Sequence, residues 1–118
     1  MKMFLPFIFC LLSTVPAFAQ RAGDGASGVL RVLDKVTGDA VDLPLGTGET
    51  GALGHLKVTL HECRFPASNP SGDAFALITV QYRDQPEPVF AGWLIASAPA
   101  LNAMDHPRYD IWALRCKS

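Results

Sequence analysis

The stretch HLKVTLHEC, residues 55–63, decides the fold class of this chain. Its apolar and polar side chains alternate residue by residue, with Leu56, Val58 and Leu60 in one set and Lys57, Thr59 and His61 in the other. A period of two places these sets on opposite faces of a β-strand that is buried on one side. The stretch therefore predicts a strand that packs one face against a second layer.

Five further segments have the composition of strands and are separated by glycine- and proline-containing turns: residues 29–36, 40–45, 74–82, 89–97 and 109–116. A tight turn at Thr37-Gly38-Asp39 joins the first two and predicts a hairpin. Residues 74–82 are apolar on both faces, which is typical of the middle strand of a covered sheet. Together the six segments predict an all-β fold, namely a small six-stranded antiparallel sandwich or barrel.

One short helix is predicted near residues 99–105. Pro99 suits the first turn of a helix, and Leu101 and Met104 fall on one side of it. Pro107 disfavours helical geometry at the residue before it, so we expect the helix to end there.

The N-terminal residues 1–19 have the organisation of a secretory signal peptide. A positive start precedes an apolar run over residues 4–15 and the A-x-A cleavage site at residues 17–19. This run is shorter than the roughly 20 apolar residues of a membrane helix. We therefore expect a cleaved signal peptide, a flexible lead over residues 20–27 and a single β domain over residues 28–118. The mature protein is expected to be exported, without direct membrane insertion.

The charges of the chain exclude some classes of partner. It has 10 Lys and Arg residues against 11 Asp and Glu residues, and no run of like charge. Nucleic-acid binding needs a basic stripe, and electrostatic membrane binding needs a polybasic patch. We expect neither kind of partner.

Two cysteines, Cys63 and Cys116, remain after removal of a signal peptide that contains Cys10. Export places them in an oxidising compartment, where thiols pair. We therefore expect one disulfide between Cys63 and Cys116 to close the domain.

Two patterns in the middle of the chain resemble cofactor sites. Residues 46–51, GTGETG, match G-x-G-x-x-G, but a strand follows them where a dinucleotide site needs a helix. His55, His61 and Cys63 share one face of the predicted strand, but a closed zinc site needs four ligands and the cysteine is expected in the disulfide. We expect neither a cofactor nor a metal.

Catalysis is an alternative that rests on Ser97 as nucleophile and His106 as base, with Asp105 or Asp110 as third member. Ser97 lacks the glycine-flanked elbow of a hydrolase and fits a helix cap, while His106 before Pro107 fits a helix end. We expect no enzymatic activity.

The aromatic residues are the remaining candidates for binding: Phe75, Tyr82, Phe90, Trp93, Tyr109 and Trp112. Stacked on a sheet face, they could hold a protein partner or a sugar, whereas the alternative for Trp93 and Trp112 is a core position beside the disulfide. The candidate interaction surface is Trp93, Asp105, His106, Tyr109 and Trp112.

Four stretches resemble a bacterial family: LRVLDKVTG (residues 30–38), PLG (residues 44–46), LKVTLHEC (residues 56–63) and FAGWLIASAPALNAMDHPRYDIWALRC (residues 90–116). The chain is similar to the secreted family catalogued as domain of unknown function 2155. This resemblance implies a small exported domain of Gram-negative bacteria with no assigned activity, in which two cysteines correspond to Cys63 and Cys116. Genes of the family tend to lie near the gene for an accessory subunit of the respiratory NADH dehydrogenase, which implies an association with that complex.

The predicted function is therefore non-catalytic binding of a protein partner in the periplasm. Its most specific form is an accessory subunit on the periplasmic face of the inner-membrane NADH dehydrogenase. The first alternative is a small-ligand- or glycan-binding module, and the second is a hydrolase that uses Ser97 and His106. An exposed apolar patch favours a protein partner, whereas a concave aromatic pocket favours a ligand.

Overall fold

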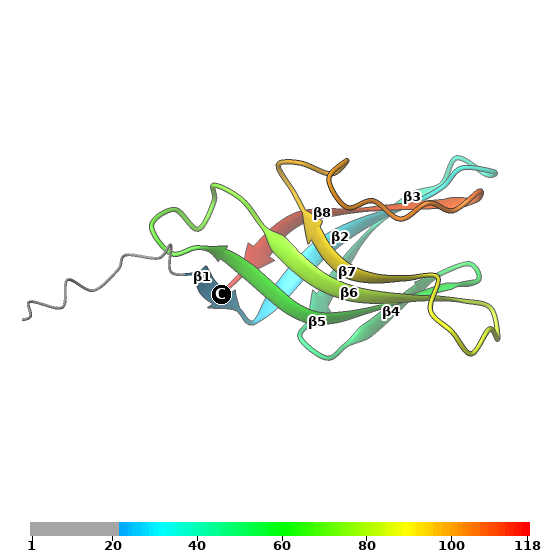
Figure 1. The fold of residues 1–118 in the computed structure, drawn as a ribbon, viewed down its shortest axis with the longest axis horizontal. Helices are drawn as coiled ribbons and strands as arrows, with labels where there is room; N and C mark the ends of the chain where they lie inside the picture. Colours follow the sequence, from blue (N-terminus) through cyan, green and yellow to red (C-terminus); the bar gives the residue numbers. More distant parts are fainter. Residues whose placement is uncertain (1–21) are drawn as a thin grey trace, which may run out of the picture.

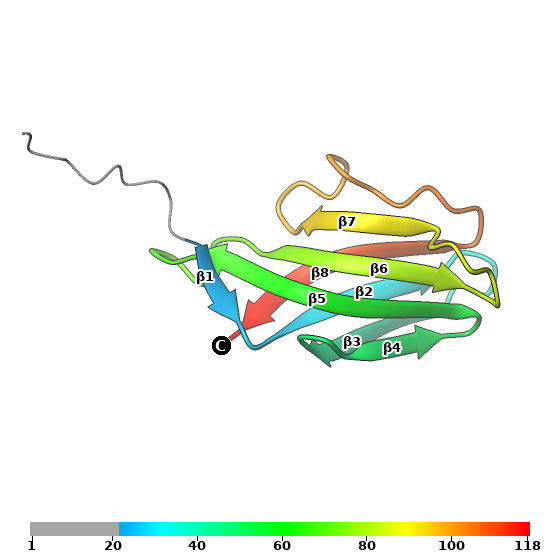
Figure 2. The same cartoon turned by 60° about the horizontal axis from the view of Figure 1, so that its bottom comes forward.

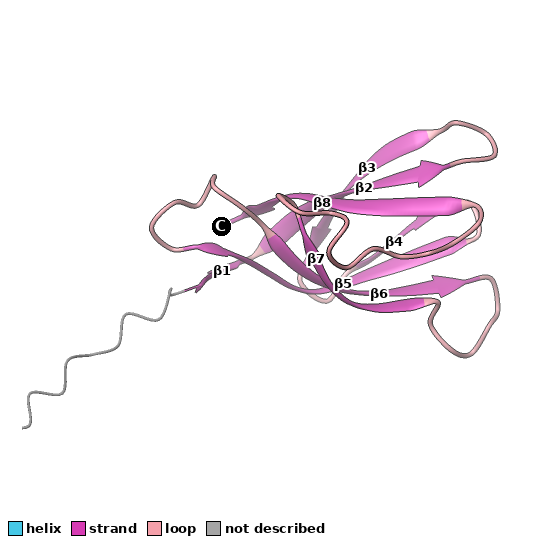
Figure 3. Cartoon of the chain, turned by 45° about the horizontal axis from the view of Figure 1, so that its top comes forward, coloured by secondary structure: helices cyan, strands magenta, loops and turns pink. Residues whose placement is uncertain are grey.

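The computed structural model describes residues 22–118, and these form eight strands and no helix (Figure 1, Figure 3). The strands are β1 (Ala22–Gly25), β2 (Ser27–Asp34), β3 (Ala40–Gly46), β4 (Thr50–Leu53), β5 (Leu56–Pro66), β6 (Phe75–Tyr82), β7 (Phe90–Ile95) and β8 (Tyr109–Lys117). The predicted signal peptide, residues 1–19, lies outside the described residues.

Two antiparallel sheets pack face to face (Figure 2). The first has five strands in the order β1-β5-β6-β7, with β4 also pairing with β5, and the second has three strands in the order β3-β2-β8. The two sheets stay separate, so the structure confirms the predicted all-β antiparallel fold as a sandwich and not as a barrel. The number of strands is eight where the sequence predicted six.

Both additional strands pair with β5. β1 lies within residues 20–27, the predicted lead, and pairs with the last four residues of β5. β4 pairs with the first half of β5, where the hydroxyl oxygens of Thr50 and Thr59 are 2.7 Å apart. Each segment is four residues long and contains glycine, so neither shows an alternating pattern. Their strand geometry comes from pairing with β5, which local sequence does not reveal.

The stretch that predicted the fold forms most of β5, with Leu56, Val58 and Leu60 fully buried. A β-bulge between Leu60 and Glu62 adds one residue and changes the phase of the strand. Cys63 therefore points into the core, while His61 points outward. The prediction that these two residues share a face is wrong because of the bulge.

A disulfide joins Cys63 of β5 to Cys116 of β8 and so links the two sheets, as predicted. Gly28 of β2 packs against it, since a Cβ at this position would lie 2.8 Å from the Sγ atom of Cys63. The absence of a side chain at Gly28 therefore allows the second sheet to approach the disulfide.

β6 lies in the middle of the first sheet, as predicted, but only one of its faces is covered. Ala76, Ile78 and Val80 are buried in the core. Phe75 and Leu77 are half-buried on the opposite face. An antiparallel sheet usually presents polar side chains to water on such a face. The apolar outer face of β6 is therefore a candidate contact surface.

Residues 96–108, which we call the crossover loop, take the place of the predicted helix at 99–105. β7 and β8 run in the same direction, so the loop must return along the length of the sandwich (Figure 2). A helix advances about 1.5 Å per residue and an extended chain about 3.3 Å. The prediction of a helix is wrong: turns and bends occupy residues 99–102, and the non-helical residues 103–106 lead back along the sandwich over a distance that a helix of the same length would not span. Met104, in the extended part, is buried in the hydrophobic core.

Candidate functional site

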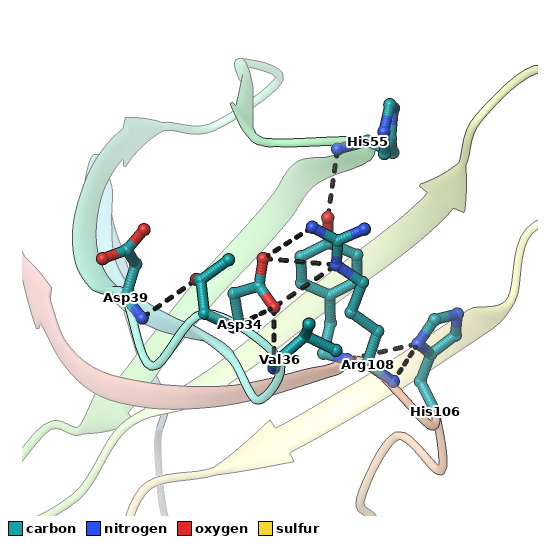
Figure 4. A network of polar contacts seen from close by, with 8 residues as sticks. Asp34, Val36, Asp39, His55, His106 and Arg108 are labelled. Atoms are coloured by element: carbon teal, nitrogen blue, oxygen red, sulfur yellow. Dashed lines mark hydrogen bonds and ion pairs between the residues drawn. The ribbon is translucent and has the colours of Figure 1, made fainter.

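Polar side chains close one end of the sandwich, where the turns after β2 and β4 meet the end of the crossover loop (Figure 4). Asp34 ends β2 and is only 4% exposed. Arg108 donates to its carboxylate from Nη2 at 3.0 Å and from Nε at 3.2 and 3.3 Å. These hydrogen bonds lower the pKa of Asp34 to about 2, against the effect of burial. The ion pair fastens the crossover loop to β2.

His106 accepts hydrogen bonds from the backbone at the start of β8. Its Nδ1 accepts hydrogen bonds from the backbone N–H groups of Arg108 at 3.1 Å and of Tyr109 at 3.2 Å. The residue is 9% exposed, and its burial, together with the charge of Lys35, lowers the pKa of His106. The imidazole is therefore neutral at neutral pH, with its proton on Nε2, and acts as a structural acceptor.

Tyr109 is fully buried beneath the turn between β4 and β5. Its hydroxyl oxygen accepts a hydrogen bond from the backbone N–H of His55 at 3.2 Å. Gly54 in this turn has a φ of 57°, and a Cβ there would lie 2.5 Å from the hydroxyl oxygen of Tyr109. Glycine is therefore required at position 54 for two reasons: the backbone is left-handed, and the Tyr109 hydroxyl lies where a Cβ atom would be. Tyr109 anchors the turn from below.

The predicted interaction surface of Trp93, Asp105, His106, Tyr109 and Trp112 does not assemble. His106 and Tyr109 are buried because hydrogen bonds satisfy their polar atoms, whereas Asp105 is exposed. The two tryptophans are half-buried and alternate with core residues, so they lie on the outer faces of different sheets. These five residues therefore cannot contact one partner surface together.

Trp93 lies in an apolar environment on the outer face of the first sheet. Leu77 of β6 is its direct cross-strand neighbour, and the guanidinium carbon of Arg64 lies 5.5 Å from its ring centre. Trp112 lies opposite Arg31 on the second sheet. Arg31 in turn forms an ion pair with Asp42 at 2.7 Å, so the surroundings of Trp112 are polar.

Leu101 is the most exposed large apolar residue in the part of the chain that the structure describes, at 76%. Its backbone N–H donates to the carbonyl of Ala98 at 3.1 Å, and the Ala98 N–H donates to the carbonyl of Ile95 at 3.2 Å. Asn102 Nδ2 donates to the carbonyl of Trp93 at 2.7 Å. These bonds hold Leu101 in water beside the edge of β7. Sequence reasoning missed it, because a leucine in a predicted helix is expected to face the core.

Ser97 and His106, the predicted catalytic alternative, lie at opposite ends of the molecule. Ser97 Oγ donates to Asp73 Oδ2 at 2.7 Å, and Asp73 is close to the start of β6. The His106 ring centre lies 4.7 Å from that of Tyr82, which ends β6. A strand of this length separates the two sites by roughly 25 Å. The two side chains therefore cannot act on one substrate.

The two cofactor-like patterns are also apart from any assembled site. Residues 46–51 run from the last residue of β3 into β4, so a strand and not a helix follows the turn. His61 Nε2 lies 2.7 Å from the hydroxyl of Thr79, and Cys63 is held in the disulfide. Within residues 22–118, no three His, Cys, Asp or Glu side chains are grouped to bind a metal ion.

Comparison with known proteins gives the family of the chain. The family model described as "Uncharacterized protein conserved in bacteria (DUF2155)" matches residues 28–116. The chain belongs to this family. An uncharacterized protein of Rickettsia prowazekii (strain Madrid E) is 30% identical over 93 residues, which cover 76% of this chain and 60% of that relative. No solved structure matches the chain.

The DUF2155 family has no activity in its description. The segments that carried the resemblance to DUF2155 mostly have structural tasks here. Residues 90–93 lie in β7, and residues 106–110 supply His106 and Tyr109 to the closed end of the sandwich. Leu101 is the exception, since the fold leaves it in water. Within the described residues of this DUF2155 protein there is also no helix long and apolar enough to cross a membrane.

Proposed function

We propose that this protein is a non-catalytic interaction domain of the periplasm and that Leu101 and Trp93 contact its protein partner. The observation that supports this proposal is the exposure of Leu101, a residue 76% exposed on a hydrogen-bonded loop. An exposed leucine gives folding almost no hydrophobic stabilisation, whereas burial against a partner contributes roughly 1.5–3 kcal/mol. Because the loop is already ordered, binding at Leu101 needs little further ordering of the backbone.

The outer face of the first sheet adds area to this contact. Two cross-strand pairs lie side by side there, Phe75 with Ile95 and Leu77 with Trp93. Arg64 borders them and lies within 4 Å of acidic side chains on either side, Asp24 at 3.6 Å and Glu62 at 3.3 Å. An apolar centre with a tryptophan and a charged rim is the usual composition of a protein interface.

The proposed partner is the inner-membrane respiratory NADH dehydrogenase, approached from its periplasmic side. This choice rests on the resemblance to the family and on the genes near which its members are encoded. A protein is favoured over a sugar because the aromatic side chains lie on sheet faces or in the core. A pocket of about 390 Å³ is lined by Gly54, His55, Lys57, Arg83 and Asp84, without any of these aromatic residues.

Purification of the tagged protein from membranes solubilised in mild detergent tests the proposal. We expect subunits of NADH dehydrogenase to co-purify with the wild type and to be lost with Leu101→Asp. Val36→Asp is the matched control, because Val36 is 73% exposed in the turn after β2. Equal recovery with both variants contradicts the role of Leu101. Absence of the respiratory complex from the wild-type sample contradicts the proposed partner.

A further inference from the structure

A polar pocket of about 390 Å³ lies at the closed end of the sandwich, where the turn between β4 and β5 meets the loop after β6. Its lining includes the side chains of Lys57 from β5 and of Arg83 and Asp84 from the loop after β6. Gly54 and His55 complete it from the turn. The proposed partner contact uses none of these residues, so the pocket has no assigned role.

The walls of the pocket are hydrogen-bonded to each other. The backbone N–H of Arg83 donates to the carbonyl of His55 at 2.8 Å, which joins the two loops. The backbone N–H of His55 donates to the buried hydroxyl of Tyr109 at 3.2 Å. The backbone of both loops is therefore positioned before any ligand arrives, while the lining residues remain exposed to solvent.

Two cations that line the pocket form no ion pair within the described residues. Among the ion pairs of the described residues, none includes Lys57 or Arg83. The guanidinium carbon of Arg83 lies 5.2 Å from the ring centre of Tyr82, so the ring supports the side chain from one face. A guanidinium held in this way keeps its N–H groups free for an oxyanion.

The backbone of Arg83 is strained. Its φ is 55°, and it is the one non-glycine residue with a positive φ among residues 22–118. Glycine and asparagine take this left-handed conformation most easily. An arginine at such a position gives up some folding stability, and strain of this kind is concentrated at ligand sites.

We propose that this pocket binds a small oxyanion of the phosphate class, with Arg83 and Lys57 as its charged contacts. The ligand carries the group either on a soluble molecule or on a lipid headgroup. The carboxylate of Asp84 in the same lining repels the anion and so lowers the affinity of the site. Removal of this charge should therefore raise the affinity.

Titration of inorganic phosphate into the isotope-labelled mature protein, followed by NMR, tests this site. Sodium chloride at matched ionic strength corrects for screening. We expect saturable shifts of the backbone amides of Gly54, His55, Arg83 and Asp84. Arg83→Asn, which tolerates the left-handed backbone, is expected to weaken binding at least tenfold. Asp84→Asn is expected to tighten it severalfold.

Arg115→Gln is the control for net charge, because Arg115 is an exposed cation of β8 outside this pocket. It is expected to leave the phosphate affinity within twofold of the wild type. Vesicles of phosphatidylcholine with and without phosphatidylglycerol distinguish the two sources of the group. Binding to the anionic vesicles that Arg83→Asn abolishes assigns a lipid headgroup, and phosphate binding alone assigns a soluble ligand. Shifts that do not saturate, or that persist unchanged in Arg83→Asn, overturn the proposal.

Discussion

Removal of the disulfide is expected to cost this domain a large part of its stability. Cys63 and Cys116 are separated by 53 positions and connect the two sheets. In the chain-entropy model, closing a loop of this length lowers the entropy of the unfolded state by an amount worth about 4 kcal/mol at room temperature. The net stability of a small domain is about 5–15 kcal/mol, so the loss is a substantial fraction.

The assay is equilibrium unfolding in guanidinium chloride, followed by tryptophan fluorescence, for the wild type and for the double variant Cys63→Ala with Cys116→Ala. Reduced wild type is the essential comparison, because it keeps both sulfur atoms in place. The difference between oxidised and reduced wild type isolates the loop closure. The further difference to the alanine variant reports the packing of the two sulfur atoms, since Cys63 is 2% exposed.

We expect reduction to lower the free energy of unfolding by about 4 kcal/mol and the melting temperature by roughly 15–30 °C. The double variant is expected to be insensitive to reductant. A loss below about 1 kcal/mol on reduction refutes the reasoning, because a loop of 53 positions would then have little entropy in the unfolded state.

Three further predictions concern packing, backbone and pH. Met104→Ala is expected to lower the free energy of unfolding by about 2–5 kcal/mol, because it leaves a cavity in the hydrophobic core. Denaturant titration measures the change, and a loss under about 1 kcal/mol contradicts the core position of Met104. Gly54→Ala is expected to lower the melting temperature of the domain clearly more than Gly48→Ala. Both glycines have a positive φ, but only the Cβ of an alanine at position 54 would clash with the hydroxyl of Tyr109, so equal melting temperatures would refute this reasoning. The folded pKa of His106 lies below its ordinary value of 6.5, so the unfolded chain binds a proton first as the pH falls. His106 thus contributes a stability that is full above about pH 6.5 and decreases below it; His106→Asn, which keeps an acceptor, is expected to remove this slope from a pH series of unfolding curves, and an unchanged slope contradicts the assignment.

The strands could be predicted where one face of the sheet is buried by the other. Leu56, Val58 and Leu60 alternate in the sequence because they alternate between core and solvent in the fold. The disulfide could be predicted because Cys63 and Cys116 are the two cysteines outside the predicted signal peptide. The bulge after Leu60 could not, because it depends on how β5 pairs with β6, and no property of β5 alone specifies it.

The short helix was predicted from Pro99 and the spacing of apolar residues, and it is absent because of topology. A local pattern does not show that β7 and β8 run in the same direction and that the chain must return along the sandwich. The same limit explains Leu101, whose exposure follows from the turns that replace the helix.

The polar end of the sandwich shows a further limit of sequence reasoning. His106 and Tyr109 belong to the candidate interaction surface proposed from the sequence, yet both are buried. In the structure each finds a hydrogen-bond partner inside: the backbone N–H of Tyr109 for His106, and that of His55 for the Tyr109 hydroxyl. Such partners come from strands and loops far apart in the chain, so only the fold reveals them.

Site-specific photo-crosslinking at position 101 tests the central claim most directly. A photoreactive amino acid replaces Leu101 in one strain and Val36 in another, and both exposed positions accept it without loss of core packing. After illumination of intact cells, we predict a covalent adduct between position 101 and a subunit of the respiratory NADH dehydrogenase, and none from position 36. Adducts of equal yield from both positions, or no adduct from position 101, contradict the account.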